Sequence, residues 1–278
     1  MNNFIAFILF TALQFQPVKM AVTPKLLHPG SPLILNIYGL NPDTLYRIRF
    51  GKESLNITGS TNTAVFLGVD LAHPAGENHI YLYAGGITSP VASDSVTIQS
   101  YAYPTQYLKL PQRMVNLKPA ELKRALREQA ELDRIFENDR TKKLWKGRFI
   151  IPVRGIITTI FGVKRFLNGE PRSPHTGIDI AAKEGTPVVA TNNGLVCFRG
   201  NTFFGGNSIL IDHGQGIYSM YFHLEKYAVK NKEPVKKGQV IGYLGDTGRT
   251  TGSDLHFGLR ILNSRIDPEL LFKLNPFK

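Results

Sequence analysis

The sequence lacks several features that would place it in a well-defined class of protein. Its 278 residues include one cysteine, Cys197, which excludes an intrachain disulfide and a structural zinc site built on two or more cysteines. No apolar run reaches about 18 residues, and there is neither a heptad pattern nor a repeat of about 20–50 residues. A multi-span membrane protein, a coiled coil and a solenoid are therefore excluded. Cys197 lies in the apolar run 194–198 and is interpreted as a buried strand residue rather than a catalytic thiol.

Acidic residues are in the minority, with 21 against 33 basic ones and a net charge of +12. Residues 1–104 carry 5 of each sign, whereas residues 105–150 carry 12 basic and 6 acidic residues and residues 151–278 carry 16 and 10. This basic second half fits a polyanionic partner such as a nucleic acid, an anionic lipid surface or an acidic cell-wall polymer, although solubility alone also explains it. A nucleic acid is not expected, because the sequence has no helix-turn-helix, zinc finger or RNP-like strand.

The N-terminus carries a short apolar segment, Phe4–Leu13. It is too short to span a bilayer but suits the apolar region of a signal peptide, so residues 1–21 are predicted to be a signal peptide. We expect an exported protein of the periplasm or cell envelope, with no membrane span once the signal is removed. One cysteine is compatible with a compartment where disulfides are permitted but not required. A buried first strand or an uncleaved anchor is the alternative.

Residues 22–101 read as six or seven short strands separated by turns. This density predicts an immunoglobulin-like β-sandwich that serves as a binding or positioning module. His73 and His79 are isolated, and we interpret them as surface or strand positions. The expected strands are Leu33–Ile37, Leu45–Phe50, Ser54–Thr58, Ala64–Val69, His79–Tyr83 and Val91–Ile98.

Residues 102–148 are predicted to be a linker that contains one amphipathic helix over Leu117–Trp145. Lys118-Pro119 is typical of a helix start, because proline is favoured in the first turn. The interpretation is a solvated helix packed on a neighbouring domain; a partner-binding or inhibitory helix is the alternative. Its expected apolar stripe consists of Leu122, Ala125, Leu126, Leu132, Ile135 and Phe136.

Residues 149–278 return to a β pattern, and the whole chain is predicted to be mainly β. Short strands alternate with glycine-rich turns, and a helix is expected only at Pro268–Leu274. The expected strands include Pro187–Ala190, Ser208–Asp212, Ile217–Phe222 and Gln239–Leu244.

Three histidines of this last segment occur in contexts that suggest chemistry. His175 and Asp179 are four residues apart, and Asp254 and His256 are two apart, so each pair is expected to face one side of an extended segment. His223 ends an apolar strand. Imidazole nitrogen and carboxylate oxygen are suitable zinc ligands, and two histidines with one aspartate could leave a coordination position open for water, as in hydrolytic sites.

The order of these motifs resembles the M23 peptidase family, the lysostaphin-type zinc metallopeptidases. The motifs are His-x-Gly-x-Asp from His175, Tyr-x-His-Leu from Tyr221 and Leu-His-Phe from Leu255. The resemblance covers about residues 149–272, and the preceding β-domain is similar to an N-terminal module of some members. Surrounding blocks agree with it: 161–162, 185–188, 206–207, 211–214, 235–242 and 248–252.

The resemblance implies one Zn²⁺ ion and a glycine-rich substrate groove. Its zinc ligands would be His175, Asp179 and His256. His223 would be a catalytic histidine that orients or deprotonates the water or stabilises the oxyanion, while His213 would shape a turn. The residues expected to line the groove are Phe203, Phe204, Arg249 and Thr250.

One position departs from the family pattern, because Asp254 stands where the last motif usually has a second catalytic histidine. An ionised carboxylate only accepts hydrogen bonds and cannot stabilise an oxyanion by donating one. Three interpretations follow. Asp254 is a general base, or it is a fourth zinc ligand, or the domain is degenerate and keeps the metal without turnover.

Two functions of different class follow. The first is a zinc-dependent endopeptidase that hydrolyses the peptide cross-links of bacterial peptidoglycan. The alternative is a catalytically degenerate M23 domain that binds peptidoglycan or regulates another cell-wall hydrolase. Peptidoglycan is the expected partner in both. The sequence indicates neither which cross-link is cut nor an oligomeric state.

Overall fold

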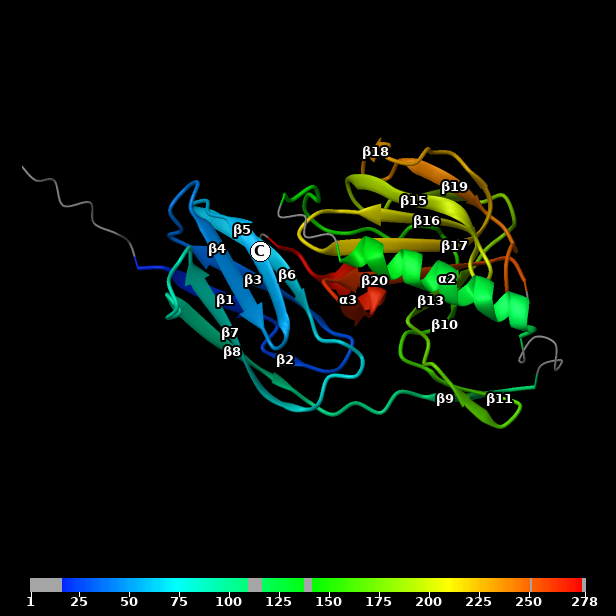
Figure 1. Cartoon of the computed structure of the whole chain (residues 1–278), viewed down its shortest axis with the longest axis horizontal. Coiled ribbons are helices and arrows are strands. Elements are labelled where there is room, and N and C mark those ends of the chain that lie inside the picture. The colour runs from blue at the N-terminus through cyan, green and yellow to red at the C-terminus, as the bar shows by residue number, and fades with distance from the viewer. Residues whose placement is uncertain (1–16, 110–116, 138–141, 251, 277–278) are drawn as a thin grey trace, which may run out of the picture.

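The computed structural model describes residues 17–109, 117–137, 142–250 and 252–276. The chain is mainly β, as predicted, with an N-terminal sandwich beside a larger C-terminal sheet structure (Figure 1). Within the described residues, no helix is long and apolar enough to cross a membrane. The predicted signal peptide falls mostly on residues 1–16, which lie outside the described residues.

The N-terminal sandwich consists of two sheets that share one apolar core. Alternating side chains from both sheets fill this core, among them Leu35, Ile48 and Leu82. The sandwich is present as predicted, and its immunoglobulin-like character stays a prediction. One sheet has the order β1 (Lys19–Thr23), β3 (Pro32–Tyr38), β6 (Asn62–Gly68); the other has the order β2 (Leu26–Leu27), β8 (Ala92–Ile98), β7 (Gly76–Ala84), β4 (Leu45–Phe50), β5 (Glu53–Thr58).

The first strand was not expected from the sequence. β1 begins at Lys19, which pairs with Tyr38 of β3, and its Val22 is buried in the sandwich core. The boundary predicted after residue 21 therefore lies inside a strand. The strand is only five residues long, which is too short for an alternation of apolar and polar side chains to predict it from the sequence.

Strands β3 and β6 of the β1–β3–β6 sheet are buried on both faces, which ties the sandwich to the C-terminal half. Its second face carries Ile34 and Phe66, and Phe66 packs against Trp145 with ring centroids 4.8 Å apart. Arg265 Nη2 also lies 2.6 Å from Asp70 Oδ1 across the same boundary. Burial alone would raise the pKa of Asp70, but the bonds from Arg265 outweigh it and lower the pKa to about 2.

Helix α2 (Pro119–Phe136) is shorter than the predicted helix. Lys142–Trp145 is not helical, and Trp145 is instead buried between the two halves of the chain; residues 138–141 lie outside the described residues. Ala125 and Phe136 of the expected stripe are buried, whereas Leu122 and Leu126 are exposed. The helix crosses the face of the C-terminal sheet (Figure 1), as expected for an amphipathic helix packed on a neighbouring domain.

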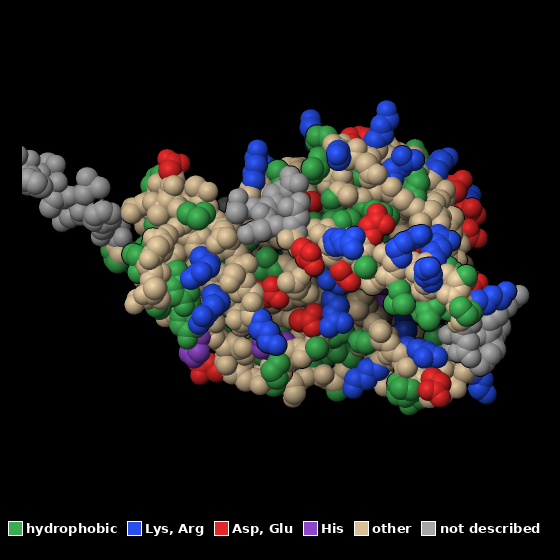
Figure 2. All heavy atoms as spheres, viewed as in Figure 1, with side chains coloured by type: hydrophobic (Ala, Val, Ile, Leu, Met, Phe, Trp, Pro, Cys, Tyr) green, Lys and Arg blue, Asp and Glu red, His purple; other side chains and the backbone are tan. Residues whose placement is uncertain are grey.

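The C-terminal half is built around a ten-stranded sheet, and Lys and Arg side chains are frequent on its surface (Figure 2). Its main path is β10 (Ile156–Thr159), β13 (Gly177–Ala181), β20 (Asp254–Ile261), β17 (Ile217–Tyr227), β16 (Gly206–Asp212), β15 (Gly194–Thr202), β18 (Pro234–Val235). Off this path, β14 (Pro187–Val189) pairs with β19 (Val240–Leu244), β19 also pairs with β17, and β21 (Ser264–Ile266) pairs with β20. Helix α3 (Pro268–Lys273) follows, close to the predicted bounds.

A separate three-stranded sheet lies beside the large one. It has the order β12 (Glu170–Arg172), β11 (Lys164–Leu167), β9 (Thr105–Leu108), so a strand of the predicted linker joins the C-terminal half. β11 and β12 form a hairpin around Asn168-Gly169, with φ of 53° and 86°. Such left-handed values suit this dipeptide and identify a two-residue hairpin turn.

Candidate functional site

A cavity of about 880 Å³ lies between the large sheet and the small one. Asp179, His223, Asp254 and His256 all line it, so four of the five predicted metal and catalytic residues meet in one place. Gln106 and Leu108 of β9 complete the side formed by the small sheet.

Strands β13 and β20 position the first two candidate ligands. Asp179 and His256 are Cα partners in the antiparallel register, and Asp179 Oδ1 lies 2.7 Å from His256 Nδ1. The strands approach closely beside them, because a Cβ added at Gly177 would come within 2.4 Å of the backbone oxygen of Phe257. The glycine therefore keeps the two strands, and the two side chains, at this spacing.

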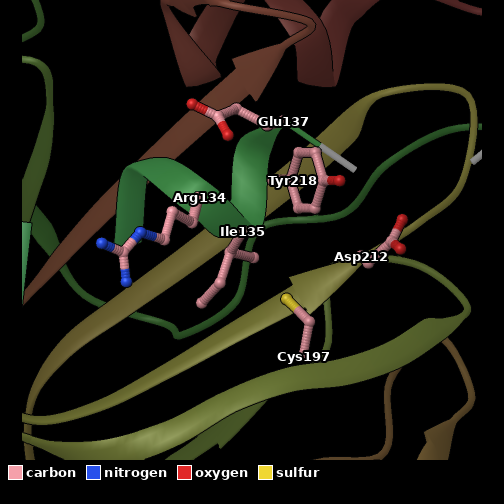
Figure 3. A pocket seen from close by; sticks show the side chains of 6 residues that line it. All are labelled: Arg134, Ile135, Glu137, Cys197, Asp212 and Tyr218. Carbon is pink, nitrogen blue, oxygen red and sulfur yellow. The ribbon is translucent and has the colours of Figure 1, made fainter. Parts of the chain in front are cut away.

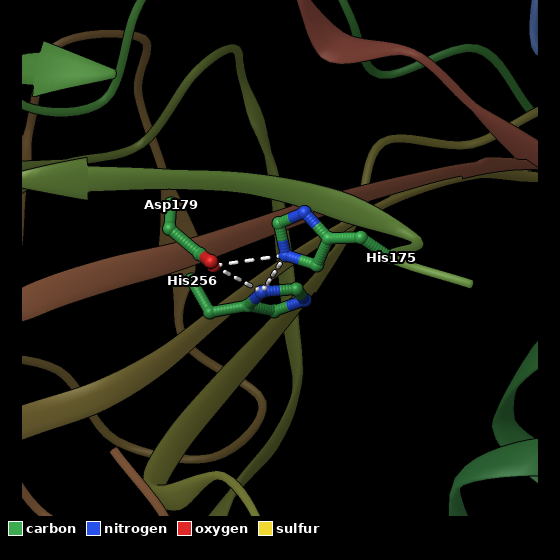
Figure 4. Close-up of side chains that lie close together, drawn as sticks. All are labelled: His175, Asp179 and His256. Carbon is green, nitrogen blue, oxygen red and sulfur yellow. Dashed lines mark hydrogen bonds and ion pairs between the residues drawn. The ribbon is translucent and has the colours of Figure 1, made fainter. Parts of the chain in front are cut away.

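His175 reaches the same point from the loop that precedes β13, and not from an extended strand as predicted. Its Nδ1 lies 2.9 Å from the backbone oxygen of Ile160. A carbonyl only accepts, so Nδ1 carries the hydrogen and Nε2 presents a lone pair. This Nε2 lies 2.9 Å from both Asp179 Oδ1 and His256 Nδ1 (Figure 4).

The donor set fits a divalent cation such as zinc. One atom each from His175, Asp179 and His256 lies within 4.8 Å of the others. When His175 is neutral, the lone pair of its Nε2 and an ionised Asp179 oxygen face each other at 2.9 Å, which is repulsive unless a positive charge lies between them. Two imidazole nitrogens and one carboxylate oxygen are typical of zinc sites that keep an open position.

The surroundings favour the charge states that metal binding needs. Burial alone would raise the pKa of Asp179, but its close contacts with His175 and His256 outweigh burial and hold the pKa well below its usual range. Burial lowers the pKa of His256, an effect that the bond to Asp179 offsets only in part. Arg165 Nη2 lies 3.3 Å from Asp179 Oδ2 and supports the carboxylate from its other side.

His223 faces the same cavity with its tautomer set by the backbone. Its Nδ1 lies 2.7 Å from the backbone oxygen of Thr247, so Nδ1 donates and Nε2 is left as an acceptor. The backbone of His223 has a φ of 65°, a left-handed value that is uncommon outside glycine and often marks a functional position. The His223 and His256 ring centroids are 6.4 Å apart.

Asp254 lies on the same face of β20 as His256, as the spacing predicts. Its Oδ1 accepts a hydrogen bond from Thr250 Oγ1 at 2.7 Å. Asp254 is not among the three side chains whose donor atoms converge. The geometry therefore gives no support to the interpretation of Asp254 as a fourth ligand.

Three of the four predicted groove residues line the cavity: Phe204, Arg249 and Thr250. Phe203 does not. Its backbone N–H donates to Glu128 of α2 at 2.6 Å, and its ring lies beneath the Arg124 guanidinium of that helix. The adjacent side chains of Phe203 and Phe204 point in different directions. The sequence position of Phe203 next to Phe204 therefore does not place it in the groove.

The cavity also contains residues that sequence reasoning missed. Arg165 and Arg172 of the β11–β12 hairpin line it. The signal that could have found them is the Asn168-Gly169 dipeptide between two short β-rich segments, which predicts a hairpin and places its flanking residues opposite each other.

His213 and Cys197 lie away from this cavity. His213 is fully buried, with Nδ1 2.7 Å from the backbone oxygen of Asn193 and Nε2 2.7 Å from Ser219 Oγ. Cys197 is on β15 and lines a separate cavity of about 350 Å³ beneath the end of α2, together with Ile135 and Tyr218 (Figure 3). No group of three converging metal donors other than the His175 cluster occurs among the described residues.

Comparison with known proteins places these residues in a family. Residues 173–268 match the model of peptidase family M23. The chain is 42% identical over 94 residues to the DD-carboxypeptidase/endopeptidase Mpg of Neisseria meningitidis serogroup B, which covers 34% of this chain and 22% of that protein. It is 38% identical over 101 residues to the murein hydrolase activator NlpD of Salmonella dublin, covering 36% and 26%. The match thus spans about a quarter or less of these relatives.

A solved structure agrees over a longer stretch. A Pseudomonas aeruginosa protein described as a peptidase M23 superposes with a TM-score of 0.69 at 26% identity, covering 88% of this chain and 94% of that one. The sandwich and the C-terminal sheet therefore occur together in another protein. The resemblance inferred from the sequence motifs is confirmed, and the chain belongs to peptidase family M23.

Proposed function

We propose that the chain is a zinc-dependent endopeptidase that hydrolyses the peptide cross-links of bacterial peptidoglycan. The observation that carries this proposal is the convergence of His175 Nε2, Asp179 Oδ1 and His256 Nδ1 at one edge of an open cavity. The relative from Neisseria meningitidis is named as a DD-carboxypeptidase/endopeptidase, which supports peptide hydrolysis as the reaction.

The side chains around the cavity provide the means for proton transfer. A zinc ion held by the three converging atoms would supply a Lewis acid that polarises a scissile carbonyl and makes water more acidic. His223 accepts the proton of the attacking water at Nε2, because its Nδ1 hydrogen is committed to Thr247. Once protonated, the same nitrogen donates a hydrogen bond to the developing oxyanion or a proton to the leaving amine.

Asp254 is the second proton acceptor in this proposal. The hydrogen bond from Thr250 Oγ1 to Asp254 Oδ1 orients the carboxylate. A carboxylate in this position takes a proton from water but cannot stabilise an oxyanion by donation. His223 therefore carries the oxyanion role alone, whereas a histidine at position 254 would share it.

Asp254 also favours a second function. If a carboxylate at position 254 prevents turnover, the domain binds peptidoglycan or regulates another cell-wall hydrolase. One relative, NlpD of Salmonella dublin, is named as a murein hydrolase activator and is 38% identical to this chain over 101 residues.

The two functions separate in one assay on the full chain. Zinc-loaded wild-type protein, Asp254→Asn and Asp254→His are incubated with cross-linked peptidoglycan, and the released fragments are analysed by mass spectrometry. If the chain is an endopeptidase, the wild-type protein cleaves cross-links. The rate of cleavage is then expected to fall about 10²-fold or more in Asp254→Asn. If wild type is inactive and Asp254→His gains cleavage, the regulatory function is correct. If neither variant nor wild type cleaves, the endopeptidase proposal fails.

The proposal places the protein in the cell envelope. Peptidoglycan carries carboxylates, and the basic surplus of residues 105–278 suits such a polymer. The proposed export signal at residues 1–21 is tested by expressing the full chain in a bacterial host and fractionating the cells. Recovery in the periplasm or envelope is expected, and recovery in the cytoplasm alone would contradict it.

A further inference from the structure

Three arginine side chains line the cavity next to the proposed metal site. Arg165 of β11 and Arg172 of β12 are Cα partners across the hairpin. Arg249 comes from the loop after β19, with its guanidinium 4.4 Å from the centroid of the Phe204 ring. Burial lowers the pKa of Arg249, and the charges of Arg165 and Arg172 lower it further, which shows that the three groups share one electrostatic environment.

The Arg165–Arg172 pair carries a cost for the hairpin. Like charges directly opposite each other on neighbouring strands are destabilising. The two-residue turn at Asn168-Gly169 sets the register, so the two arginines cannot separate by slipping along the strands. A like-charge pair held at the rim of a cavity is typical of a site that binds an anion.

Arg165 and Arg172 also have hydrogen-bonding capacity that the described part of the chain leaves unused. Nη2 of Arg165 contacts Asp179 Oδ2 at 3.3 Å, but its Nε is buried and has no hydrogen-bond partner within the described residues. Arg172 forms no ion pair in the described part of the chain. A buried donor without a partner is unfavourable, and a ligand oxygen would satisfy it.

The carboxylates that line the cavity do not balance this charge. Asp179 Oδ1 already contacts His175 and His256. Asp254 accepts the hydrogen bond from Thr250. Three guanidinium groups therefore face two carboxylates, of which Asp179 pairs with Arg165, and the cavity keeps an excess of positive charge.

We propose that Arg165, Arg172 and Arg249 form a subsite for a carboxylate of the substrate, so that the enzyme selects acidic peptides over neutral ones. This inference rests on the proposed peptidase function. A guanidinium matches the two oxygens of a carboxylate and remains charged at physiological pH. The substrate class is a cross-linked peptide with a free carboxylate near the bond that is cut, rather than an uncharged peptide bridge.

The test compares two forms of one probe. Cross-linked muropeptide dimers with free carboxylates are compared with the same dimers after conversion of their carboxyl groups to carboxamides. Binding to the zinc-loaded full chain that carries His223→Ala is measured by titration calorimetry, because this variant keeps the proposed ligands and lacks the proposed catalytic histidine. The acidic dimers are expected to bind at least about tenfold more tightly than the amidated ones.

Arginine variants identify the source of this preference. Arg172→Gln and Arg249→Gln are each expected to weaken binding of the acidic dimers about tenfold and to leave binding of the amidated dimers unchanged. Arg154→Gln, an exposed position that does not line the cavity, is the matched control and should change neither. Arg172→Gln should also keep or raise the melting temperature, because it removes a like-charge contact, so weaker binding would not reflect unfolding.

The outcomes distinguish this subsite from the proposed function. The subsite is supported if wild type prefers acidic dimers and if Arg172→Gln and Arg249→Gln abolish this preference. This holds even if wild type cleaves no cross-links. Equal binding of the two forms, or no binding of either, overturns it, and cleavage of cross-links by wild type would still support the peptidase. Competition by millimolar inorganic phosphate without any acid-over-amide preference would indicate a general anion site and would also overturn it.

Discussion

Asp179 and His256 face each other as directly opposed residues of β13 and β20, with Asp179 Oδ1 2.7 Å from His256 Nδ1. Side chains alternate along a strand, so a register shift of one residue would turn both groups to the other face of the sheet. The proposed metal site is therefore built into the pairing of two central strands. His175 completes it from a loop fastened to Ile160.

Asp179→Asn should abolish metal binding. The change removes the only carboxylate among the three converging side chains and leaves an amide that binds zinc poorly. We expect zinc affinity to fall by at least about a hundredfold, measured by competition with a colorimetric chelator. Asp246→Asn, at an exposed position, is the matched control and should bind zinc as wild type does. Retention of normal zinc affinity by Asp179→Asn would contradict the assignment.

His223→Gln should separate catalysis from metal binding. Glutamine can still donate to the Thr247 oxygen but cannot accept a proton at neutral pH. The rate of cross-link cleavage is expected to fall about 10²–10⁴-fold while zinc content stays normal. The two readouts are cleavage measured by mass spectrometry and zinc measured in the same preparation. A variant that loses zinc as well would show that His223 acts as a ligand instead.

Gly177→Ala should disturb the site through the backbone. An added Cβ would lie 2.4 Å from the oxygen of Phe257 and 3.0 Å from His256 Cε1, so strand β20 would have to move. We expect a loss of roughly 1–3 kcal/mol in the free energy of unfolding together with weaker zinc binding. The control is Gly252→Ala, where nothing lies within 4 Å of the added atom. Equal stability of the two variants would show that β13 and β20 are not held this closely.

His213 should make the stability of the fold depend on pH. Burial lowers the pKa of His213 to about 4, from 6.5 for a free side chain. Between these values the unfolded chain binds the proton more readily, so the free energy of unfolding falls as the pH decreases from about 6.5 to about 4. The shift corresponds to about 3 kcal/mol.

The measurement is chemical denaturation of wild type and His213→Gln at several pH values. Wild type should lose stability relative to the variant as the pH falls through this range, and the difference should become constant below about pH 4. Groups common to both proteins, such as His256, cancel in this comparison. His79→Gln, at an exposed position, should follow wild type throughout. A difference that is independent of pH would show that His213 can be protonated within the fold.

Local patterns predicted the strands well. Leu45–Phe50 has the predicted bounds, because alternating apolar residues and flanking turn residues mark its ends. The same period placed Asp254 and His256 on one face of β20. Residues 117–145 were predicted less well: the helix ends at Phe136, and Trp145 lies outside it, buried against Phe66. Tertiary packing of this kind leaves no signal in a local window.

The shape of the cavity could not be predicted in the same way. The pairing of β9 with β11 joins residues about sixty positions apart, and nothing in either segment specifies its partner. The proposed ligand set could be predicted only through the resemblance of its motifs to a family, since the spacing of His175 and Asp179 is common by chance. Asn168-Gly169, by contrast, is a local turn signal, and the arginines that flank it could have been paired from the sequence.

We propose that His175, Asp179 and His256 hold a zinc ion that this chain uses to cut peptidoglycan cross-links. The most direct measurement is mass spectrometry of cross-linked peptidoglycan after incubation with the full chain, with zinc, after chelation, and after zinc is restored. We expect cross-linked dimers to be converted to monomers, chelation to stop the conversion and added zinc to restore it. Conversion that continues unchanged after chelation, or no conversion by zinc-loaded protein, would contradict this proposal.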